Sequence, residues 1–249
     1  IAKTKSCVGI GIPGSISPKT NLVRNANSTW LIGNPLKTDL ESLLNRPVLI
    51  DNDANCFTVS EAIDGSGKNY QSIFGIILGT GVGAGVLVDK KLHRGANYIA
   101  GEWGHNPIPW PNIEELNGSP CYCGKYGCIE TFLSGPALEK LYEQKTQKKL
   151  TVPEIILQAH EQNKDAETIL NEYENRLARA LAQVINILDP DVIVAGGGLS
   201  NIDRLYSNIP KIWNNYIFSD YTSTVFLKAK HGDSSGVRGA AWLWDSKNG

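Results

Sequence analysis

The sequence predicts an α/β fold, and three observations carry that prediction. Short apolar or β-branched segments alternate with segments of helical periodicity along the 249 residues. Several predicted strands end in glycine, which is typical of α/β proteins that bind ligands at the carboxyl ends of strands. At about 150 residues per domain, the length suits one large domain or two lobes.

Each element is predicted from its own local pattern. Apolar or β-branched runs that end in turn residues predict strands, at 6–12, 47–50, 72–78, 86–88, 192–195 and 225–227. Apolar residues at helical spacing predict helices, at 39–45, 56–63, 138–145, 152–162, 166–188, 202–213 and 236–244. The region 90–128 is rich in Gly, Pro, Asn and Cys, and we expect it to be irregular.

The longest helix is predicted over 166–188. Its apolar stripe at helical spacing consists of Leu170, Tyr173, Leu177, Ala180, Leu181, Val184, Ile185 and Leu188. Asp189 and Pro190 end the helix, because a residue before proline disfavours the helical conformation.

The composition excludes several classes of function. The 24 basic residues nearly balance the 25 acidic ones, so we expect neither a nucleic-acid partner nor binding to an anionic membrane. No membrane-spanning run and no signal-peptide pattern is visible in the sequence, and we expect a cytoplasmic protein. Five cysteines, an odd number, argue against a disulfide framework.

The strongest local signal is a cluster of cysteines. Cys121, Cys123 and Cys128 lie close together, and His105 precedes them. Three thiolates and an imidazole are the usual donors of a closed tetrahedral zinc site, so we expect structural Zn²⁺ here. The alternative is a loop with three reduced cysteines and no metal.

A glycine-rich run at 79–85 lies between two predicted strands. It fits the pattern of a dinucleotide fingerprint, but that fingerprint must open a helix, whereas this run leads into the strand at 86–88. We therefore expect a β-hairpin whose backbone N–H groups approach phosphate oxygens, with Thr80 adding a hydroxyl. The alternative is a plain glycine-rich turn.

The run Asp51-Asn52-Asp53-Ala54-Asn55 joins a predicted strand to a predicted helix. Its side chains can cap the helix, because Asp and Asn are favoured at that position. One of its carboxylates can instead act as a general base beside a polar partner. The residues alone leave both interpretations open.

Two further groups of residues can bind ligands. Glu102, His105 and Glu130 flank the cysteine cluster and, if the metal loop holds them together, can bind a polyol; exposed carboxylates are otherwise commonly only solvated. Ala195-Gly-Gly-Gly198 follows a buried strand, where glycines let a flat ligand such as adenine lie on the backbone or simply form a tight turn.

Together these motifs resemble the ROK family (repressors, open reading frames and kinases) over nearly the whole chain. The resemblance rests on the run from Leu78 to His105, on 51–55, on the three cysteines and on 195–198. Several stretches are similar to one branch, the bacterial fructokinases or manno(fructo)kinases, at 11–18, 25–30, 101–107 and 228–236.

The resemblance implies a two-lobed actin/hexokinase-like (ribonuclease H-like) α/β fold, with sugar and ATP in the cleft between the lobes. The small lobe would comprise 1–68 and the C-terminal helix 236–249. The large lobe, 69–235, would hold the zinc loop and the nucleotide-binding glycines. A homodimer is also expected.

The implied activity is that of an ATP-dependent fructokinase, which transfers the γ-phosphoryl group of ATP to the 6-hydroxyl of fructose, with mannose and glucose as further candidates and Mg²⁺ accompanying ATP. Asp53 would be the catalytic base. Sugar hydroxyls would contact Gly14, Asn27, Asn52, Glu102, His105 and Glu130. ATP would contact Gly79, Thr80, Gly81, Gly83, Gly197 and Gly198. Zinc would be bound by His105, Cys121, Cys123 and Cys128.

One motif of the family is missing. The family opens with a strand and an Asp-x-Gly-Gly-Thr loop that binds phosphate and magnesium, and this sequence contains none. The sequence also begins with Ile1 and contains no methionine. We therefore expect a longer kinase whose first lobe is incomplete at its N-terminus in this chain.

Two other functions share these motifs. A kinase for N-acetylglucosamine or N-acetylmannosamine would have every motif named above, because the shape of the pocket selects the hexose. A ROK-type sugar-responsive transcriptional repressor is the other alternative. Against it, Asp53 is present and no basic recognition helix is visible.

Overall fold

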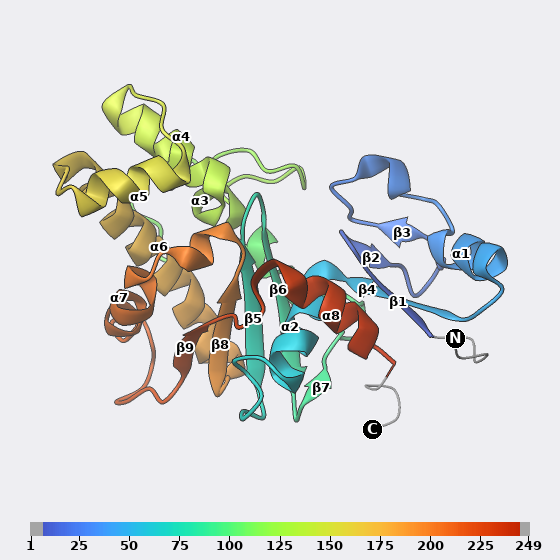
Figure 1. Cartoon of the computed structure of the whole chain (residues 1–249). Helices are drawn as coiled ribbons and strands as arrows, with labels where there is room; N and C mark the ends of the chain where they lie inside the picture. The colour runs from blue at the N-terminus through green and yellow to red at the C-terminus, as the bar shows by residue number, and fades with distance from the viewer. Residues whose placement is uncertain (1–6, 245–249) are drawn as a thin grey trace. The chain divides into compact units, whose positions relative to one another are not determined.

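The strands lie in three sheets within residues 7–244, the part of the chain that this computed structural model describes. Two sheets have two strands each, β1 with β4 and β2 with β3, and the third has the order β7-β6-β5-β8-β9 (Figure 1). The strands are β1 (Val8–Ile12), β2 (Ser15–Ile16), β3 (Val23–Arg24), β4 (Val48–Asn52), β5 (Ile73–Leu78), β6 (Val82–Val88), β7 (Lys91–Leu92), β8 (Val192–Gly196) and β9 (Val225–Lys228).

Helices lie in half of the connections between consecutive strands. The α-helices are α1 (Leu36–Leu44), α2 (Asp53–Ile63), α3 (Glu130–Leu133), α4 (Gly135–Thr146), α5 (Val152–His160), α6 (Lys164–Leu188), α7 (Arg204–Trp213) and α8 (Ser235–Trp242). The short 3-10 helices are η1 (Thr29–Leu31), η2 (Glu102–His105), η3 (Gly198–Asn201) and η4 (Gly232–Ser234). Every predicted strand and helix has an observed counterpart. The predictions missed short elements such as β2, β3, β7 and α3, whose patterns are too brief to detect.

The chain divides into two units at positions that differ from the predicted lobes. Unit 1 comprises Ile1–Gly75, Ala84–Gly101 and Ala229–Gly249, and unit 2 comprises Ile76–Gly83 and Glu102–Lys228. Within unit 1, the start of β5 and the end of β6 pack closely on α2. A Cβ atom at Gly75 or Gly85 would lie 2.2 or 2.4 Å from Thr58 Oγ1, so only glycine allows this approach. The ends of the predicted small lobe, 1–6 and 245–249, lie outside the described residues.

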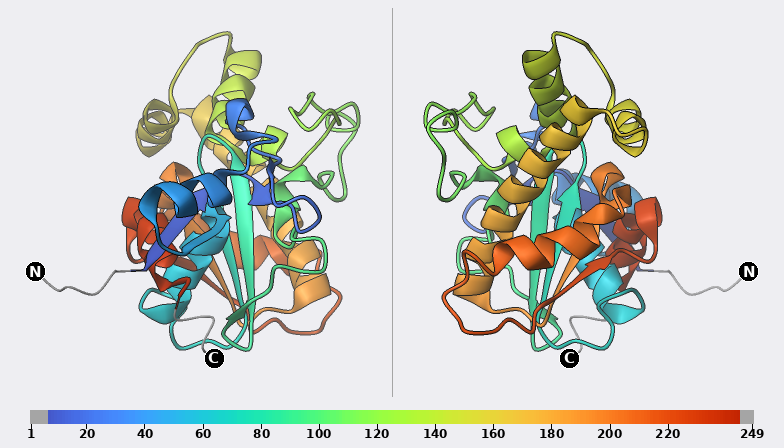
Figure 2. Two further views of the ribbon diagram at one scale, coloured as in Figure 1. Left: turned by 90° about the vertical axis from the view of Figure 1, so that its right-hand side faces the viewer. Right: turned by 90° about the vertical axis from the view of Figure 1, so that its left-hand side faces the viewer.

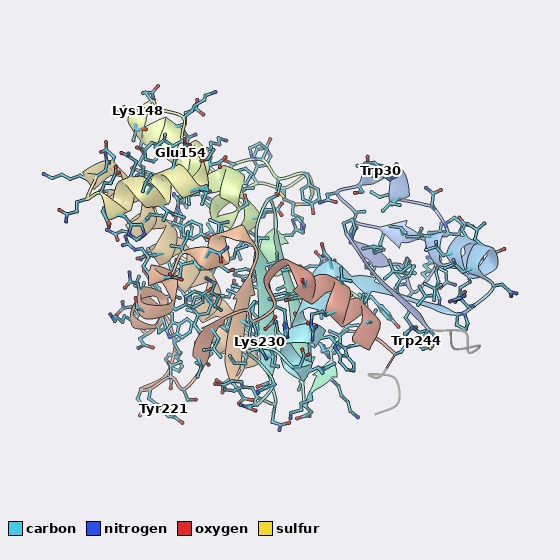
Figure 3. The ribbon with its side chains drawn as sticks, viewed as in Figure 1. Trp30, Lys148, Glu154, Tyr221, Lys230 and Trp244 are labelled. Atoms are coloured by element: carbon cyan, nitrogen blue, oxygen red, sulfur yellow. The ribbon has the colours of Figure 1, made fainter. Side chains whose placement is uncertain are left out.

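Unit 1 is organised around α2 and α8, which lie side by side (Figure 1). A Cβ at Gly239 would lie 1.6 Å from the carbonyl oxygen of Cys56, and one at Gly9 would lie 1.8 Å from that of Ala240. Trp244, labelled in Figure 3, donates its indole N–H to the carbonyl of Val8 at 2.9 Å. Glycines therefore let α8 sit directly against α2 and β1.

A buried carboxylate also attaches the segment before α8 to α2. Glu61 is completely buried and accepts hydrogen bonds from the backbone N–H of Lys230 at 3.0 Å and from Ser235 Oγ at 2.8 Å. Lys230, labelled in Figure 3, also donates its ammonium to the carbonyl of Asp64 at 3.1 Å. Because a buried carboxylate needs donors, these bonds determine where the C-terminal segment meets α2.

Unit 2 is built on the long helix α6, which Figure 2 shows along its length. The side chain of Asn163 caps its N-terminus by accepting from the N–H groups of Asp165 and Ala166. Asp189 ends it in a left-handed conformation, φ +47°. Most of the predicted apolar stripe is buried. The prediction of this helix is confirmed.

A buried ionic network connects α6 to the loop that precedes the cysteine cluster. Glu115 accepts from Arg176 Nε at 2.7 Å and from Arg179 Nη2 at 2.8 Å, and Arg179 also donates to the carbonyls of Pro109 and Trp110. Although burial acts in the opposite direction, these arginines help to hold the pKa of Glu115 below its usual value. The irregular segment is thus attached to a rigid helix.

Within residues 7–244, no helix combines the length and the apolar character that a membrane span requires.

Candidate functional site

The predicted catalytic base, Asp53, is the first residue of α2. The preceding residue, Asn52, caps the helix: its Oδ1 accepts from the N–H of Ala54 at 2.9 Å and from that of Asn55 at 3.4 Å. The capping role left open by the sequence therefore belongs to Asn52. Asp53 Oδ1 also accepts from the N–H of Ala54, at 2.8 Å, which orients its carboxylate at the helix N-terminus.

The environment of Asp53 raises the pKa of its carboxyl above the ordinary value. The side chain reaches solvent, yet the surrounding protein removes enough water from it to disfavour the charged form. Hydrogen bonds from the backbone of Ala54 and from the side chain of Asn52 offset part of this effect. A carboxylate with a raised pKa is a better proton acceptor, as a general base requires.

Asp51 has a structural role beside Asp53. One of its oxygens accepts from Asn55 Nδ2 at 2.7 Å, and the other pairs with Arg94 Nε at 2.6 Å. Because Asp51 is buried and already paired, it is a poor candidate for a proton acceptor. The sequence analysis missed Arg94, since only the fold brings it next to Asp51.

Gly14 lies next to Asn52. Its φ is +76°, and a Cβ there would lie 2.3 Å from the carbonyl oxygen of Arg24. Its own carbonyl accepts from Asn52 Nδ2 at 3.0 Å. The backbone of Asn25 and Ala26 also borders Gly14, so the exposed residue Asn27 follows close by. Unit 1 therefore brings Gly14 together with Asn52 and, through Asn52, with Asp53.

The glycine-rich run forms the predicted hairpin, and its residues 79–83 belong to unit 2. β5 and β6 are neighbouring strands joined by residues 79–81, and no helix follows. Glu130, the first residue of α3, accepts from the N–H of Val82 at 2.9 Å. A Cβ at Gly81 would lie 2.7 Å from the same Glu130 oxygen. The predicted sugar-binding residue Glu130 thus borders the predicted phosphate hairpin.

Glu102 and His105 lie on η2, which packs on β6. The packing requires glycine at position 104, because a Cβ there would lie 2.2 Å from the carbonyl oxygen of Val82. Trp103, buried, donates its indole N–H to the carbonyl of Ala180 at 3.3 Å. Both predicted sugar-binding residues on η2 are therefore held on the same strand that Glu130 reaches.

The four predicted zinc ligands lie together, with their donor atoms all within 4.8 Å of one another. Cys121 Sγ is 3.5 Å from His105 Nδ1, and Cys123 Sγ is 3.6 Å from Cys128 Sγ. Tetrahedral zinc with ordinary bond lengths separates two sulfurs by about 3.8 Å and a sulfur from a nitrogen by about 3.5 Å. The donor set and its spacing fit Zn²⁺.

The distances also distinguish the two nitrogens of His105. Nδ1 faces Cys121, while Nε2 lies 3.0 Å from the hydroxyl of Tyr122. The two rings also meet edge to face at 5.0 Å. Burial, together with the charges of Glu130 and Glu102, raises the pKa of Tyr122 to about 12, so this hydroxyl keeps its proton.

The predicted adenosine-binding glycines lie against the end of β5. Gly197 has φ +82°, and a Cβ there would lie 2.4 Å from the carbonyl oxygen of Leu78, so only glycine fits. A Cβ at Gly198 would meet nothing within 4 Å, as at Gly79. Gly135, at the start of α4, donates its N–H to the carbonyl of Gly79 at 2.8 Å. This bond attaches the start of α4, which Ser134 caps, to the hairpin.

Solved structures resemble this fold closely. A ROK hexokinase from Thermus thermophilus matches with a TM-score of 0.84 and 26% identity, over 98% of this chain and 80% of that chain. A ROK family glucokinase from Streptomyces griseus, solved with glucose and AMPPNP, matches with a TM-score of 0.80 and 26% identity, over 99% and 83%. The predicted α/β hexokinase-like fold is confirmed.

The curated relatives are kinases as well. The N-acetyl-D-glucosamine kinase of Erwinia tasmaniensis is 41% identical over 243 residues, which cover 96% of this chain and 80% of the relative. Together with the structural matches, this similarity confirms the expected enzyme class, an ATP-dependent sugar kinase. The chain belongs to the ROK family, whose model matches residues 2–247.

The comparisons contradict one prediction, that of a fructokinase. Further relatives, from Yersinia pseudotuberculosis and Yersinia enterocolitica, are 40% and 39% identical and are also N-acetyl-D-glucosamine kinases. The assignment to the fructokinase branch, with fructose as the substrate, was therefore wrong. The stretches used for it are short, whereas the similarity to the N-acetyl-D-glucosamine kinases extends over nearly the whole chain.

Proposed function

We propose that this protein phosphorylates an N-acetylhexosamine, with N-acetyl-D-glucosamine as the first candidate and Mg²⁺-ATP as the phosphoryl donor. The observation that carries the proposal is about 40% identity to N-acetyl-D-glucosamine kinases over nearly the whole chain. The arrangement around Asp53 supports it, because a sugar kinase needs a positioned carboxylate.

Asp53 is the proposed base. A sugar hydroxyl is a weak nucleophile, so a carboxylate must take its proton as the oxygen attacks the γ-phosphoryl group. The raised pKa of Asp53 and its fixed position at the start of α2 suit this role. Asn52 and Gly14, which are joined by a hydrogen bond, would orient the sugar beside Asp53. Asn27 is proposed to contact the same sugar.

Glu102, His105 and Glu130 are proposed to bind further hydroxyls of the sugar. With Nδ1 of His105 on structural Zn²⁺, Nε2 carries the proton and can donate it to an acceptor. The zinc ion would be held by His105, Cys121, Cys123 and Cys128. In this role the metal supplies no chemistry to the transfer and only holds the loop in place.

ATP is proposed to contact both glycine-rich segments of unit 2. The transition state of phosphoryl transfer is loose, so alignment and charge neutralisation by Mg²⁺ and N–H donors do most of the work. The hairpin residues Gly79, Thr80, Gly81 and Gly83 would face the phosphates. Gly197 and Gly198 would face the adenosine, since no side chain intervenes at Gly198. A homodimer and a cytoplasmic location remain predictions.

A panel of ATP-coupled assays tests this function. Full-length protein is supplied with N-acetylglucosamine, N-acetylmannosamine, glucose, mannose and fructose. We expect the highest kcat/KM with an N-acetylated sugar. A higher kcat/KM with any sugar that lacks the acetamide would overturn the assignment, and silence across the panel would favour a binding protein without turnover.

A further inference from the structure

A buried carboxylate, Asp51, lies beside the proposed base. It belongs to the end of β4, shortly before Asp53, and is only 9% exposed. Its Oδ1 accepts from the backbone N–H of Asn52 at 2.8 Å and from Nδ2 of Asn55 at 2.7 Å. Donors of this kind favour the charged form of a carboxylate. They also attach Asp51 to residues on both sides of Asp53, so the position and the charge of Asp51 both affect the base.

Arg94 supplies the opposite charge. Its Nε donates to the other oxygen of Asp51, Oδ2, at 2.6 Å. The Asp51 side chain is buried, so solvent screens its charge little, whereas the Arg94 side chain is partly exposed. Removing one partner of a buried ion pair leaves an uncompensated charge in the protein. Without Arg94, that charge would be the negative one of Asp51, next to the proposed base.

The backbone around Arg94 is fixed on both sides. The N–H of His93 donates to the carbonyl of Val86, on β6, at 2.8 Å. The N–H of Ala100 donates to the carbonyl of Arg94 itself at 3.2 Å. These residues all belong to unit 1, as do β4 and α2. The guanidinium therefore reaches Asp51 from a defined point of the same unit.

The charges of these residues act together at the first turn of α2. Cys56, in that turn, is completely buried, and the pKa of its thiol is raised to about 12. Burial is the largest cause, the negative charges of Asp51 and Asp53 add to it, and the charge of Arg94 opposes them. The two carboxylates thus act on one buried group, and Arg94 counteracts them there.

The other elements that pack on α2 bring no further charge to this turn. A Cβ at Gly11, on β1, would lie 3.7 Å from the Cα of Asp53, but β1, β5 and β6 contain no charged residue, and β4 contains only Asp51. The one charged residue of α8, Arg238, pairs with Asp64 at the opposite end of α2. Arg94 is therefore the cation that balances Asp51 at the start of this helix.

We propose that Arg94 is a positioning residue for the phosphoryl transfer, which holds the carboxylate of Asp51 and cancels its charge so that Asp53 stays ionised and in place. A general base must be ionised before it can take a proton, and an unpaired negative charge nearby disfavours its ionised form. The proposal rests on the role of Asp53 in the proposed function, and it holds whichever hexose is the substrate.

The first test removes the cation. Arg94→Met deletes the charge and keeps an unbranched stem, and Arg94→Lys restores a cation. The kcat/KM of full-length protein is measured between about pH 5.5 and pH 8 with the best sugar of the panel. We expect the loss in Arg94→Met to be at least about threefold larger at the acid end, because more Asp53 is then protonated. Arg94→Lys should recover most of the loss.

The ion pair at the other end of α2 provides the matched control. Arg238 is about as exposed as Arg94 and also binds an aspartate, Asp64. Arg238→Met should leave the pH dependence of kcat/KM unchanged. Circular dichroism and thermal unfolding establish that each variant is folded, and Arg94→Gln replaces Arg94→Met if the latter does not fold.

A double variant separates the charge from the contact. Adding Asp51→Asn to Arg94→Met removes the unpaired charge, so kcat/KM at the acid end should rise at least about threefold above that of Arg94→Met. A contact that only supports the fold would give no such recovery, since the double variant lacks both charged partners. No recovery, or a loss in Arg94→Met that is the same at every pH, would overturn the proposal.

The outcomes distinguish this proposal from the proposed function. Near-normal turnover in Asp53→Asn would refute the role of Asp53 as the base and, with it, the role of Arg94. If Asp53→Asn is inactive while Arg94→Met keeps the pH dependence of the wild type, the proposed function stands and Arg94 has no positioning role.

Discussion

Asn52 donates its side-chain amide to the carbonyl oxygen of Gly14 at 3.0 Å, while its amide oxygen caps α2. One side chain thus connects the turn after β1, the end of β4 and the start of the helix that carries Asp53. This arrangement makes the position of the proposed base depend on a single amide, and it leads to the first prediction.

Replacing Asn52 should lower the free energy of unfolding. Asn52→Ala removes the helix cap and the bond to Gly14, so we expect a loss of about 1–2 kcal/mol in the free energy of unfolding. Asn52→Asp keeps the capping oxygen and loses the donor to Gly14. We therefore expect Asn52→Asp to be more stable than Asn52→Ala. Urea titrations of both variants measure the two free energies of unfolding, and an Asp variant less stable than the Ala variant would contradict the prediction.

Asp53→Asn should abolish turnover while preserving sugar binding. A general base contributes typically 10²–10⁴-fold to the rate, and the amide keeps the size of the carboxylate. We expect kcat to fall at least about a hundredfold, with a Kd for the sugar within about threefold of the wild type. Steady-state kinetics and calorimetry measure the two effects. Near-normal turnover would remove Asp53 from the role of base.

The same variant should show a pH-dependent gain in stability. The pKa of Asp53 in the folded protein is raised, so its carboxyl stabilises the fold below the unfolded pKa, and this contribution is lost as the pH rises through the folded pKa. Asp53→Asn cannot ionise and should therefore be more stable than the wild type at pH 7. The difference should vanish below the ordinary pKa of 3.8. Thermal unfolding from pH 3 to pH 8 (about five points) gives the comparison, and an advantage that grows on acidification would contradict the raised pKa.

Zinc removal should weaken sugar binding. Along the chain, the proposed zinc ligand His105 precedes the cysteine cluster and Glu130 follows it. The loop that contains the cysteines therefore holds both residues in place. We expect about one zinc ion per chain by elemental analysis, and about a tenfold higher Kd for the sugar after chelation. Cys123→Ser should reproduce this effect, whereas Cys7→Ser, outside the cluster, should not. Unchanged sugar binding in a zinc-free sample that is still folded would refute the link.

Much of the fold and of the site could be predicted from local sequence. The apolar stripe of α6, the glycine-rich hairpin and the cysteine spacing each depend on residues that are close together in the chain. The fold, the enzyme class and the family followed from such motifs. The identity of the hexose did not, because fructose was predicted from a few short stretches, whereas the relatives that match nearly the whole chain are N-acetyl-D-glucosamine kinases.

Sequence by itself determined the elements, their order and the chemistry-bearing residues, because helix periodicity, capping and turn preferences act over a few positions. Tertiary structure decided which of these residues meet. Arg94 reaches Asp51 across 43 positions and Glu130 reaches Val82 across 48. Only packing left the amide oxygen of Asn55 buried without a hydrogen-bond partner among residues 7–244, because burial and hydrogen bonding depend on everything that surrounds an atom in the folded chain.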